Sequence, residues 1–298
     1  MARDLALLGV PTSAGSHHAG QEKAPAAFRA AGLVEALAAA GLSVEDTGDL
    51  AVRRHRPSPP VDGVRALDRV VEVVGEVADR VAAIAATGRL PLVLGGDCTV
   101  TLGVVAGLAR QGDVGLAYVD GDADLSTPAT STSGVLDTMG VTHLLGDGAP
   151  ALAGVGPRRP LLAADHLELF GFDPAELDTG QWTRLVGHRL SATPAPVVRT
   201  DPAGHAAAAL RRLEAAAGAV LVHLDVDVLG TDDFPLANFP HPAGLTLAEL
   251  ADALAVLCGS DALAGVVVTE VAPDHDPDGV LLRRLVEVLT AALAGTTG

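Results

Sequence analysis

Three aspartates follow an apolar run near the middle of the chain, each two residues from the next. Asp120, Asp122 and Asp124 come directly after LAYV, residues 116–119. Side chains two positions apart point to the same face of a strand, so a strand continuing through this stretch would place all three carboxylates together. Three neighbouring negative charges are unfavourable unless a cation lies among them. The stretch therefore predicts a cation-binding site.

Three other apolar runs also end in residues that can bind a metal. LVLGGDC ends at Cys98, and VVVTEVAP contains Glu270. LVHLDVDVL holds Asp225 and Asp227. A single acid after a strand is commonly a helix cap or a turn residue, but this does not explain acids on alternate positions after two runs. Because ligands of open α/β sheets bind beyond the carboxyl ends of the strands, we predict one shared metal site there.

Short apolar runs alternate with longer amphipathic ones along most of the chain. Strands separated by helices are typical of a parallel sheet with helices on both faces. The stretch 146–200 has a weaker pattern, with one strand and a Pro-rich connection. We predict one α/β domain over residues 1–298. The predicted strands are 4–10, 42–50, 89–97, 114–124, 166–173, 219–229 and 263–273, and the predicted helices are 24–41, 63–87, 99–112, 133–146, 203–217, 246–258 and 279–294.

The composition limits the classes of partner. The net charge of −17 repels nucleic acid and anionic membranes and favours a cationic small ligand. Mean hydropathy is +0.36, yet no run of about 18 uncharged apolar residues is present to span a membrane. The N-terminal MARDLALLGVP predicts a first strand rather than a signal peptide. The two cysteines, Cys98 and a predicted core residue, Cys258, give no disulfide framework, which favours the cytoplasm.

The motifs together resemble the ureohydrolases, the family of arginase, agmatinase and related amidino hydrolases. LGGDCTVTLG is similar to the family's Gly-Gly-Asp-His-Ser segment, and VDGDADLSTPATSTSGVLD to its Asp-x-His-x-Asp motif and substrate loop. LDVDVL is similar to its Asp-x-Asp segment, VVVTEVAP to its final Glu segment, and residues 7–50 to its first βαβ unit. The resemblance covers nearly the whole chain and implies a three-layer α/β/α fold with a central, mostly parallel sheet.

The resemblance also implies two manganese ions and the residues that would hold them. Family histidines are replaced by Cys98, Asp122 and Asp137, the last at the position of a histidine that shuttles protons. Carried over residue by residue, the first ion would take Cys98, Asp120, Asp124 and Asp225, and the second Asp120, Asp122, Asp225 and Asp227.

These replacements change the charge of the expected site. The five acidic ligands carry −5, a Cys98 thiolate would make this −6, and two divalent ions supply only +4. Three outcomes stay open: both ions bind more firmly, one position is weakened so that a single ion or none remains, or Asp122 is protonated because its neighbours raise its pKa. A position before a helix would lower the pKa of the Cys98 thiol. Carboxylates suit Mn²⁺ and a thiolate prefers softer ions such as Zn²⁺, and Mn²⁺, which tolerates both, is the predicted ion.

The predicted substrate is a guanidino or amidino compound such as arginine or N-hydroxyarginine. Glu270 matches the family carboxylate that receives the planar cation in a two-pronged fork. The resemblance implies that hydroxide activated by the metal attacks the amidine carbon, with Asp124 and Asp137 as proton relays. The Cys at a family histidine position is similar to the branch that cleaves N-hydroxylated arginine. Residues expected to contact the rest of the substrate are Ser126, Ser131, Ser133 and Glu176.

Two other interpretations stay open. The loss of three histidines also fits an inactive or single-metal pseudoenzyme or partner subunit, although the replacing residues still ligate or ionise. A single-metal deacylase of the related fold would need a His-containing zinc site, which the sequence does not reveal. His223, two residues before Asp225, could hydrogen-bond a ligating carboxylate, and His17 and His18 follow the first strand. Because the family commonly forms trimers or hexamers, we expect a homo-oligomer.

Overall fold

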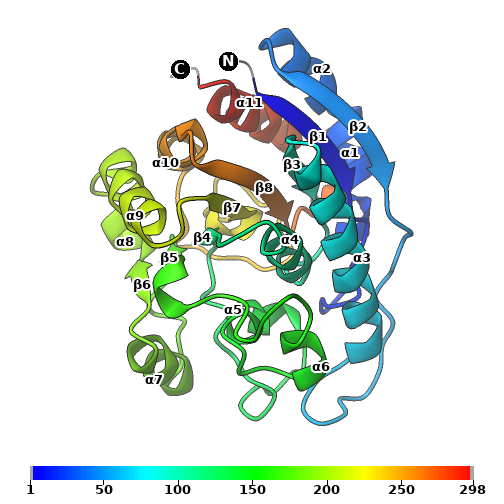
Figure 1. Ribbon diagram of the computed structural model, residues 1–298, viewed down its shortest axis with the longest axis vertical. Helices are drawn as coiled ribbons and strands as arrows, with labels where there is room; N and C mark the ends of the chain where they lie inside the picture. Colours follow the sequence, from blue (N-terminus) through cyan, green and yellow to red (C-terminus); the bar gives the residue numbers. More distant parts are fainter. Residues whose placement is uncertain (1–2, 296–298) are drawn as a thin grey trace.

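An eight-stranded sheet forms the middle of the protein in this computed structural model, which describes residues 3–295. The strand order is β2-β1-β3-β8-β7-β4-β5-β6, and every neighbouring pair is parallel (Figure 1). The strands are β1 Asp4–Gly9, β2 Ser43–Asp49, β3 Leu90–Leu94, β4 Gly115–Val119, β5 Leu167–Phe170, β6 Ser191–Thr193, β7 Val220–Asp225 and β8 Leu263–Thr269.

Helices cover both faces of this sheet, which confirms the predicted three-layer α/β/α fold (Figure 1). The strand period of two divides the core: Val93 packs on one face, and its neighbours Leu92 and Leu94 pack on the other. The first face is covered by α3 Leu67–Ala86, α4 Val100–Leu108, α5 Gly140–Leu144, α6 Pro150–Ala153 and α7 Thr179–Gly187, and the second by α1 Ala24–Ala30, α2 Leu33–Ala39, α8 Ala195–Val198, α9 Pro202–Ala217, α10 Leu247–Gly259 and α11 Val280–Ala294.

Two predicted helices differ from the structure, and several short elements were not predicted. The single helix expected over 24–41 is two helices, because Gly32 between α1 and α2 has a φ of 84°, a left-handed conformation that glycine adopts without strain. The helix expected over 133–146 is only a 3₁₀ turn, Asp137–Met139, followed by the short α5. The weakly patterned middle contains α6, α7, β6 and α8. Strand β6 was missed because it has three residues, is only partly buried and lies at the sheet edge.

The strands that lead to the predicted site end at one edge of the sheet. The order β3-β8-β7-β4 makes them consecutive neighbours, so their carboxyl ends at Leu94, Thr269, Asp225 and Val119 lie side by side. Because β4 ends at Val119, the three following aspartates lie in a loop, and the expectation of a continuing strand is wrong. The loop turns back at Asp124, whose φ of 49° is unusual for a residue with a side chain.

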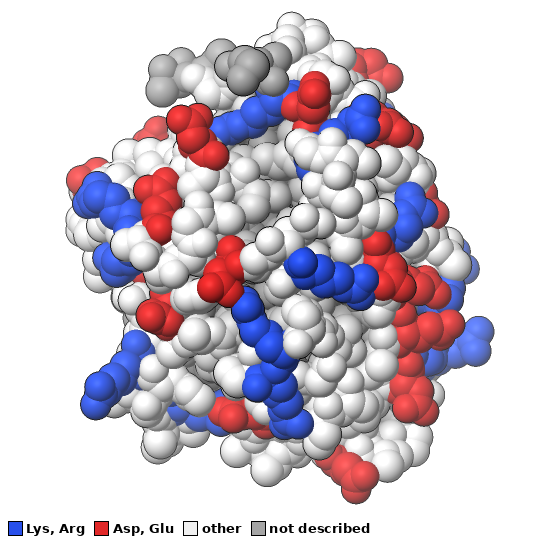
Figure 2. Space-filling view, in the orientation of Figure 1, with Lys and Arg blue, Asp and Glu red and all other residues white. Residues whose placement is uncertain are grey.

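Charged side chains of both signs are interspersed on the face that Figure 2 shows. Ion pairs of the described residues include Arg29 with Asp46 at 2.7 Å and Arg184 with Asp147 at 3.0 Å. Positive charge on this face is therefore dispersed among acids. Within residues 3–295, no helix combines the length and the apolar character needed to cross a membrane.

Candidate metal centre

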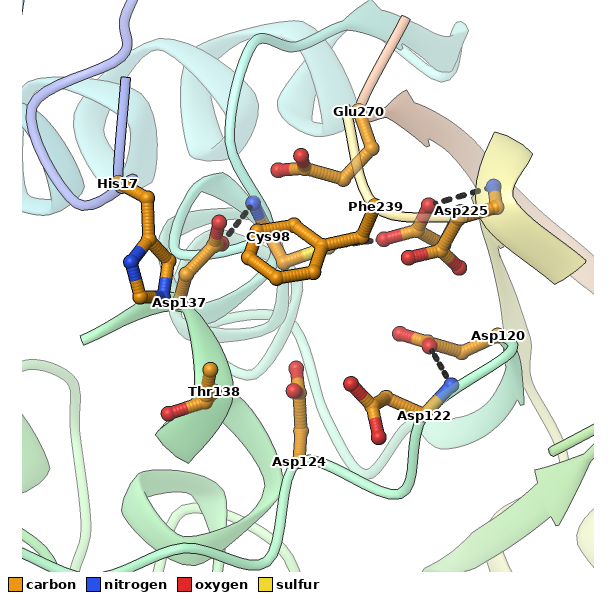
Figure 3. Close-up of a pocket in the computed structure, with 11 residues that line it drawn as sticks. His17, Cys98, Asp120, Asp122, Asp124, Asp137, Thr138, Asp225, Phe239 and Glu270 are labelled. Atoms are coloured by element: carbon orange, nitrogen blue, oxygen red, sulfur yellow. Dashed lines mark hydrogen bonds between the residues drawn. The ribbon is translucent and has the colours of Figure 1, made fainter. Parts of the chain in front are cut away.

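One pocket at the carboxyl edge of the sheet brings together all six predicted metal ligands (Figure 3). Seven of its eleven lining residues carry a carboxyl group, and no Lys or Arg is among these eleven described residues. So many acids in one buried space require protons or a bound cation. The lining residues are His17, Cys98, Asp120, Asp122, Asp124, Asp137, Thr138, Asp225, Asp227, Phe239 and Glu270.

One group of ligand atoms belongs to Cys98, Asp120, His223 and Asp225, which lie within 4.8 Å of one another. All four residues are buried. Cys98 sits in the turn between β3 and α4, Asp120 follows β4, and the other two belong to β7. The Cys98 thiol donates to Asp225 Oδ2 at 2.6 Å and lies 3.8 Å from His223 Nε2. The group contains the nitrogen ligand that the sequence did not reveal.

The surroundings of His223 turn one ring nitrogen toward this group. The ring stacks on Tyr118 with centroids 4.1 Å apart, and Nδ1 is 2.7 Å from Thr101 Oγ1. Nε2 is left 3.6 Å from Asp120 Oδ2. Burial lowers the pKa of His223 to about 3, so the ring is neutral. His223 thus lies beside Asp120, one of the carboxylates predicted to bind metal, but their 3.6 Å separation is longer than the predicted hydrogen bond.

A second group joins Cys98 to Asp137 and Glu270 within 4.8 Å. The Cys98 backbone N–H donates to Asp137 Oδ1 at 2.8 Å. Glu270 has a φ of 63°, and its Oε2 accepts a hydrogen bond from Gln21 Nε2. Its buried Oε1 has no hydrogen-bond partner among residues 3–295. A strained backbone that presents an unpaired carboxylate oxygen is typical of a ligand-binding position.

The other side of the pocket is less closely grouped. Tyr118 donates its hydroxyl hydrogen to Asp124 Oδ2 at 2.5 Å, and Asp227 Oδ1 accepts from Gly121 N at 3.1 Å. Within the described part of the chain, neither 4.8 Å group includes Asp122, Asp124 or Asp227. The structure therefore gathers Asp120 and Asp225 around Cys98 and His223, and it leaves the remaining three carboxylates apart.

His241, for which the sequence suggested no role, lies beside this second side. Its Nδ1 is 3.0 Å from Glu176 Oε2, and its Nε2 is 3.5 Å from Asp227 Oδ2. Burial alone would lower the pKa of His241, but Asp227, Asp122 and Glu176 raise it to about 10. A positively charged imidazole thus partly offsets the acids at this end. Glu176, expected at the substrate, contacts His241 and does not line the pocket.

Burial and mutual repulsion raise the pKa values of the pocket acids. Burial is the largest cause for Asp122, whose pKa rises to about 6, and for Asp137, whose pKa rises to about 8. The pKa of the Cys98 thiol is raised well above its usual value by burial and by Asp225, which corrects the expectation of a lowered value. Without a cation, several of these groups keep their protons. Burial and neighbouring acids likewise raise the pKa values of Asp120, Asp124, Asp225 and Glu270.

Comparison with known proteins supports the family resemblance found in the sequence, over nearly the whole chain. Residues 3–295 match the Arginase family. The chain belongs to the arginase family. It is 30% identical to the arginase of Brevibacillus brevis over 98% of both chains. Its fold superposes on the arginase structure from Bacillus subtilis with a TM-score of 0.88, at 25% identity and 98% coverage of both chains. A formimidoylglutamase structure from the same species, at 21% identity and a TM-score of 0.78, is similar in fold.

In this arginase-family chain, the predicted substrate-loop serines face their own loop. Ser131 Oγ is 3.3 Å from Ser133 Oγ, and the two oxygens accept hydrogen bonds from the N–H groups of Gly134 and Val135. Neither these serines nor Ser126 is among the residues that line the pocket. The mouth is formed instead by His17 and Phe239, whose ring centroids are 5.0 Å apart (Figure 3). His17, in the loop after β1, therefore lies at this pocket.

Sequence reasoning missed several residues that complete the arginase-family site. Gln21, Thr101 and Tyr118 hold Glu270, His223 and Asp124 through side-chain hydrogen bonds. Gln21 and Thr101 are far in sequence from the residues that they hold, and Tyr118 lies on a strand that ends before Asp124. No spacing rule therefore predicts these pairs. His241 and Phe239 belong to a Pro-rich segment with no periodic pattern.

Proposed function

We propose that this protein is a metal-dependent hydrolase of a guanidino or amidino compound. The observation that carries the proposal is the position of the unpaired Glu270 Oε1 in the same pocket as a buried group of four metal-binding side chains. A carboxylate oxygen without a partner, in a pocket whose described lining residues include no lysine or arginine, suits a planar cationic group. The names of the relatives, arginases and a formimidoylglutamase, support the same substrate class.

The residues present fit a metal ion. A thiol, an imidazole and two carboxylates within 4.8 Å of one another can replace their protons with a divalent cation. A metal held there would supply a water of lowered pKa, and so hydroxide near neutral pH. Mn²⁺ is the family expectation, and the carboxylates of Asp122 and Asp227 are suitable ligands for it at the second position.

Glu270 would bind and orient the substrate in this proposal. Gln21 holds Oε2, so the free Oε1 keeps a fixed direction into the pocket. The Phe239 ring, 40% exposed at the mouth, offers a flat face on which a guanidinium group can stack. A substrate bound between them would bring its amidine group into the pocket that Cys98 and Asp225 also line.

Two acids are suited to move protons. Asp124 is held by the Tyr118 hydroxyl, which fixes its second oxygen. Asp137 has a pKa raised to about 8, mainly by burial, so it can hold a proton near neutral pH and release it to a departing amine. We propose both as proton relays, with Asp137 in the place of the missing histidine.

The test is product release by the metal-loaded protein. Purified protein would be treated with chelator, reloaded with Mn²⁺, Zn²⁺ or Co²⁺, and incubated with arginine, N-hydroxyarginine, agmatine and other guanidino or amidino compounds. We expect urea, hydroxyurea or the corresponding amide product from at least one of them, and loss of that product in Glu270→Gln. No product from the panel under any saturating metal would contradict the proposal and favour the inactive relative.

We further propose a cytoplasmic homo-oligomer, a trimer or hexamer, built from one domain over residues 1–298. Support comes from the resemblance and from the reduced state that two separate buried cysteines suit. Light scattering coupled to size-exclusion chromatography would measure the mass, and a mass equal to one chain would contradict the oligomer.

A further inference from the structure

We propose that Cys98, Asp120, His223 and Asp225 form a four-ligand site for Zn²⁺ or a similarly soft ion, in which His223 Nε2 supplies the nitrogen ligand. The proposal deepens the proposed function, on which it rests for the role of the ion in hydrolysis. The proposed ligand set differs from the one that the family resemblance implies. Its nitrogen ligand comes from His223 on β7, not from any of the three positions at which a family histidine is replaced.

The positions of the four ligand atoms suit tetrahedral coordination. With zinc–ligand bonds of about 2.0–2.3 Å, neighbouring ligand atoms of a tetrahedral site are about 3.3–3.8 Å apart. His223 Nε2 lies 3.8 Å from Cys98 Sγ and 3.6 Å from Asp120 Oδ2. The Cys98–Asp225 distance of 2.6 Å is shorter, because the thiol hydrogen joins these two atoms. Replacing that proton by an ion requires this pair to separate by about 1 Å.

Each carboxylate has one oxygen held by the backbone and one that faces the group. Asp120 Oδ1 accepts from Asp122 N at 2.6 Å, and Asp225 Oδ1 accepts from Asp227 N at 2.9 Å. The free oxygens are Asp120 Oδ2, near His223, and Asp225 Oδ2, at Cys98. This arrangement orients both carboxylates without using the atoms that would bind the ion.

His223 is also oriented from outside the group. With Nδ1 protonated and donating to Thr101 Oγ1, the Nε2 lone pair points toward the other three ligands. The stack on Tyr118 prevents the ring from turning. His223 Nε2 faces the side chains of this group, Cys98 Sγ at 3.8 Å and Asp120 Oδ2 at 3.6 Å. His143, equally buried, instead uses both nitrogens with the backbone of Met139 and Ala149.

The ligand types determine which ion is favoured. A thiolate and an imidazole with two carboxylates are a soft set typical of zinc, whereas the oxygen ligands of Asp122 and Asp227 are hard. A thiolate and two carboxylates carry −3, so the site with a divalent ion has a net charge of −1. Four carboxylates around the same ion would leave −2, which is less favourable in a buried pocket. The pocket would then hold a soft ion on the Cys98 side whatever binds on the other side.

The experiment is metal binding without substrate, with Co²⁺ as a spectroscopic probe for Zn²⁺. Chelator-treated protein would be titrated with Co²⁺ and then with competing Zn²⁺ or Mn²⁺. The variants are Cys98→Ser, which removes the thiolate at nearly constant size, and His223→Asn, which keeps a polar group near Thr101 but cannot reach the ligands. Cys258→Ser, the other buried cysteine, lies outside the pocket and is the matched control.

We expect a thiolate-to-cobalt charge-transfer band with the strong visible bands of four-coordinate Co²⁺ in the wild type and in Cys258→Ser. Cys98→Ser should lose the charge-transfer band, and its affinity for Zn²⁺ relative to Mn²⁺ should fall at least about 10-fold. His223→Asn should keep the band but bind Zn²⁺ at least about 100-fold more weakly, more than the loss of an outer-shell partner costs. Circular dichroism would verify that each variant folds. If Cys98→Ser does not fold, Cys98→His would be used instead, because it replaces the thiolate by the ligand that the family resemblance implies.

A wild-type spectrum of six-coordinate Co²⁺ without the charge-transfer band would overturn the inference, as would unchanged Zn²⁺ affinity in folded His223→Asn. These results would leave the proposed hydrolase intact, provided that urea or a related product is still released with Mn²⁺. Conversely, a zinc-type spectrum without hydrolysis of any tested compound would support this site and contradict only the proposed activity.

Discussion

The two sides of the candidate metal pocket offer different ligand types to a cation. On one side, Cys98, His223 and Asp225 bring sulfur, nitrogen and oxygen together, and Thr101 and Tyr118 hold the imidazole from behind. On the other side, Asp122, Asp124 and Asp227 offer only carboxylates, and the cation nearest to them is the protonated His241.

The difference shows what replacing a histidine does to a metal site. A carboxylate in place of an imidazole adds a negative charge, so the second side keeps protons and a charged histidine in the absence of an ion. On the first side, a neutral imidazole from β7 lies beside the thiol, with His223 Nε2 3.8 Å from Cys98 Sγ. We therefore expect the Cys98 side to bind its ion more tightly than the carboxylate side.

The largest effect is expected for Asp225→Asn, because Asp225 lies between the two sides. The change removes an anionic ligand from the close group and from the expected second set, so Zn²⁺ and Mn²⁺ affinity should both fall well beyond about 100-fold. Hydrolysis should fall with them. Calorimetric titration with each metal would measure the loss. If the affinity for only one metal fell, Asp225 would be a ligand on one side alone, and the two sides would not share it.

A smaller effect, on substrate alone, is expected for Glu270→Gln. Removing the charge that faces the substrate cation should lower kcat/KM on the order of 100-fold, while metal affinity changes little. Steady-state kinetics and metal titration on the same preparation would separate the two. Glu287→Gln, on the exposed side of α11, is the control and should leave both unchanged. An equal loss of metal in Glu270→Gln would make Glu270 a ligand.

Asp122→His tests the carboxylate side directly. Restoring a neutral imidazole should remove one excess charge and raise Mn²⁺ affinity at the second position by about 10-fold. The binding of Zn²⁺ on the Cys98 side should stay the same. Mn²⁺ titration followed by electron paramagnetic resonance would report the change, and an unaltered Mn²⁺ affinity would place residue 122 outside the ligand shell.

The metal-free protein should lose stability as the pH rises. Asp122 and Asp137 have folded-state pKa values raised to about 6 and about 8, so the folded state holds protons that the unfolded chain releases near pH 4. The free energy of unfolding should therefore fall by at least about 1 kcal/mol between pH 5 and pH 8. Urea unfolding would measure this, and bound metal should remove the fall. A metal-free protein that becomes more stable over this range would refute the assignment.

The smallest effect is expected for Ser126→Ala and Ser133→Ala. Neither residue lines the pocket in the structure, so each would contribute at most one hydrogen bond to a bound substrate. KM should rise by about 3- to 10-fold with kcat and metal affinity unchanged. Kinetics with the best substrate of the panel would decide. A loss of bound metal in either variant would show that the loop supports the ligands.

Much of this architecture could be predicted from the sequence, because apolar runs and helical periods mark the buried strands and the amphipathic helices. The convergence of Cys98, Asp120 and Asp225 followed from the rule that the strand ends of a parallel sheet meet at one edge. The bend after Val119 could not be predicted, since the alternating acids that follow it are equally compatible with a continuing strand, whereas the chain bends at Gly121 and Asp122. Short elements such as β6 lack enough residues to show a period.

The contacts that distinguish this site from its family were the hardest to predict. The spacing of His223 from Asp225 placed the two on one face, but only the fold shows that Nε2 reaches Cys98, which is 125 residues away in sequence. His241 comes from a loop without a pattern, and its partner Asp227 follows a different element. Pairings between distant loops depend on the full three-dimensional packing, which periodicity does not encode.

A crystal structure of the Zn²⁺-loaded protein, with anomalous data collected on both sides of the zinc absorption edge, would show whether the Cys98 side holds an ion through His223. We expect an anomalous peak within bonding distance of Cys98 Sγ, His223 Nε2 and the Oδ2 atoms of Asp120 and Asp225. A peak bound only by Asp122 and Asp227, with His223 still turned to its protein neighbours, would contradict it.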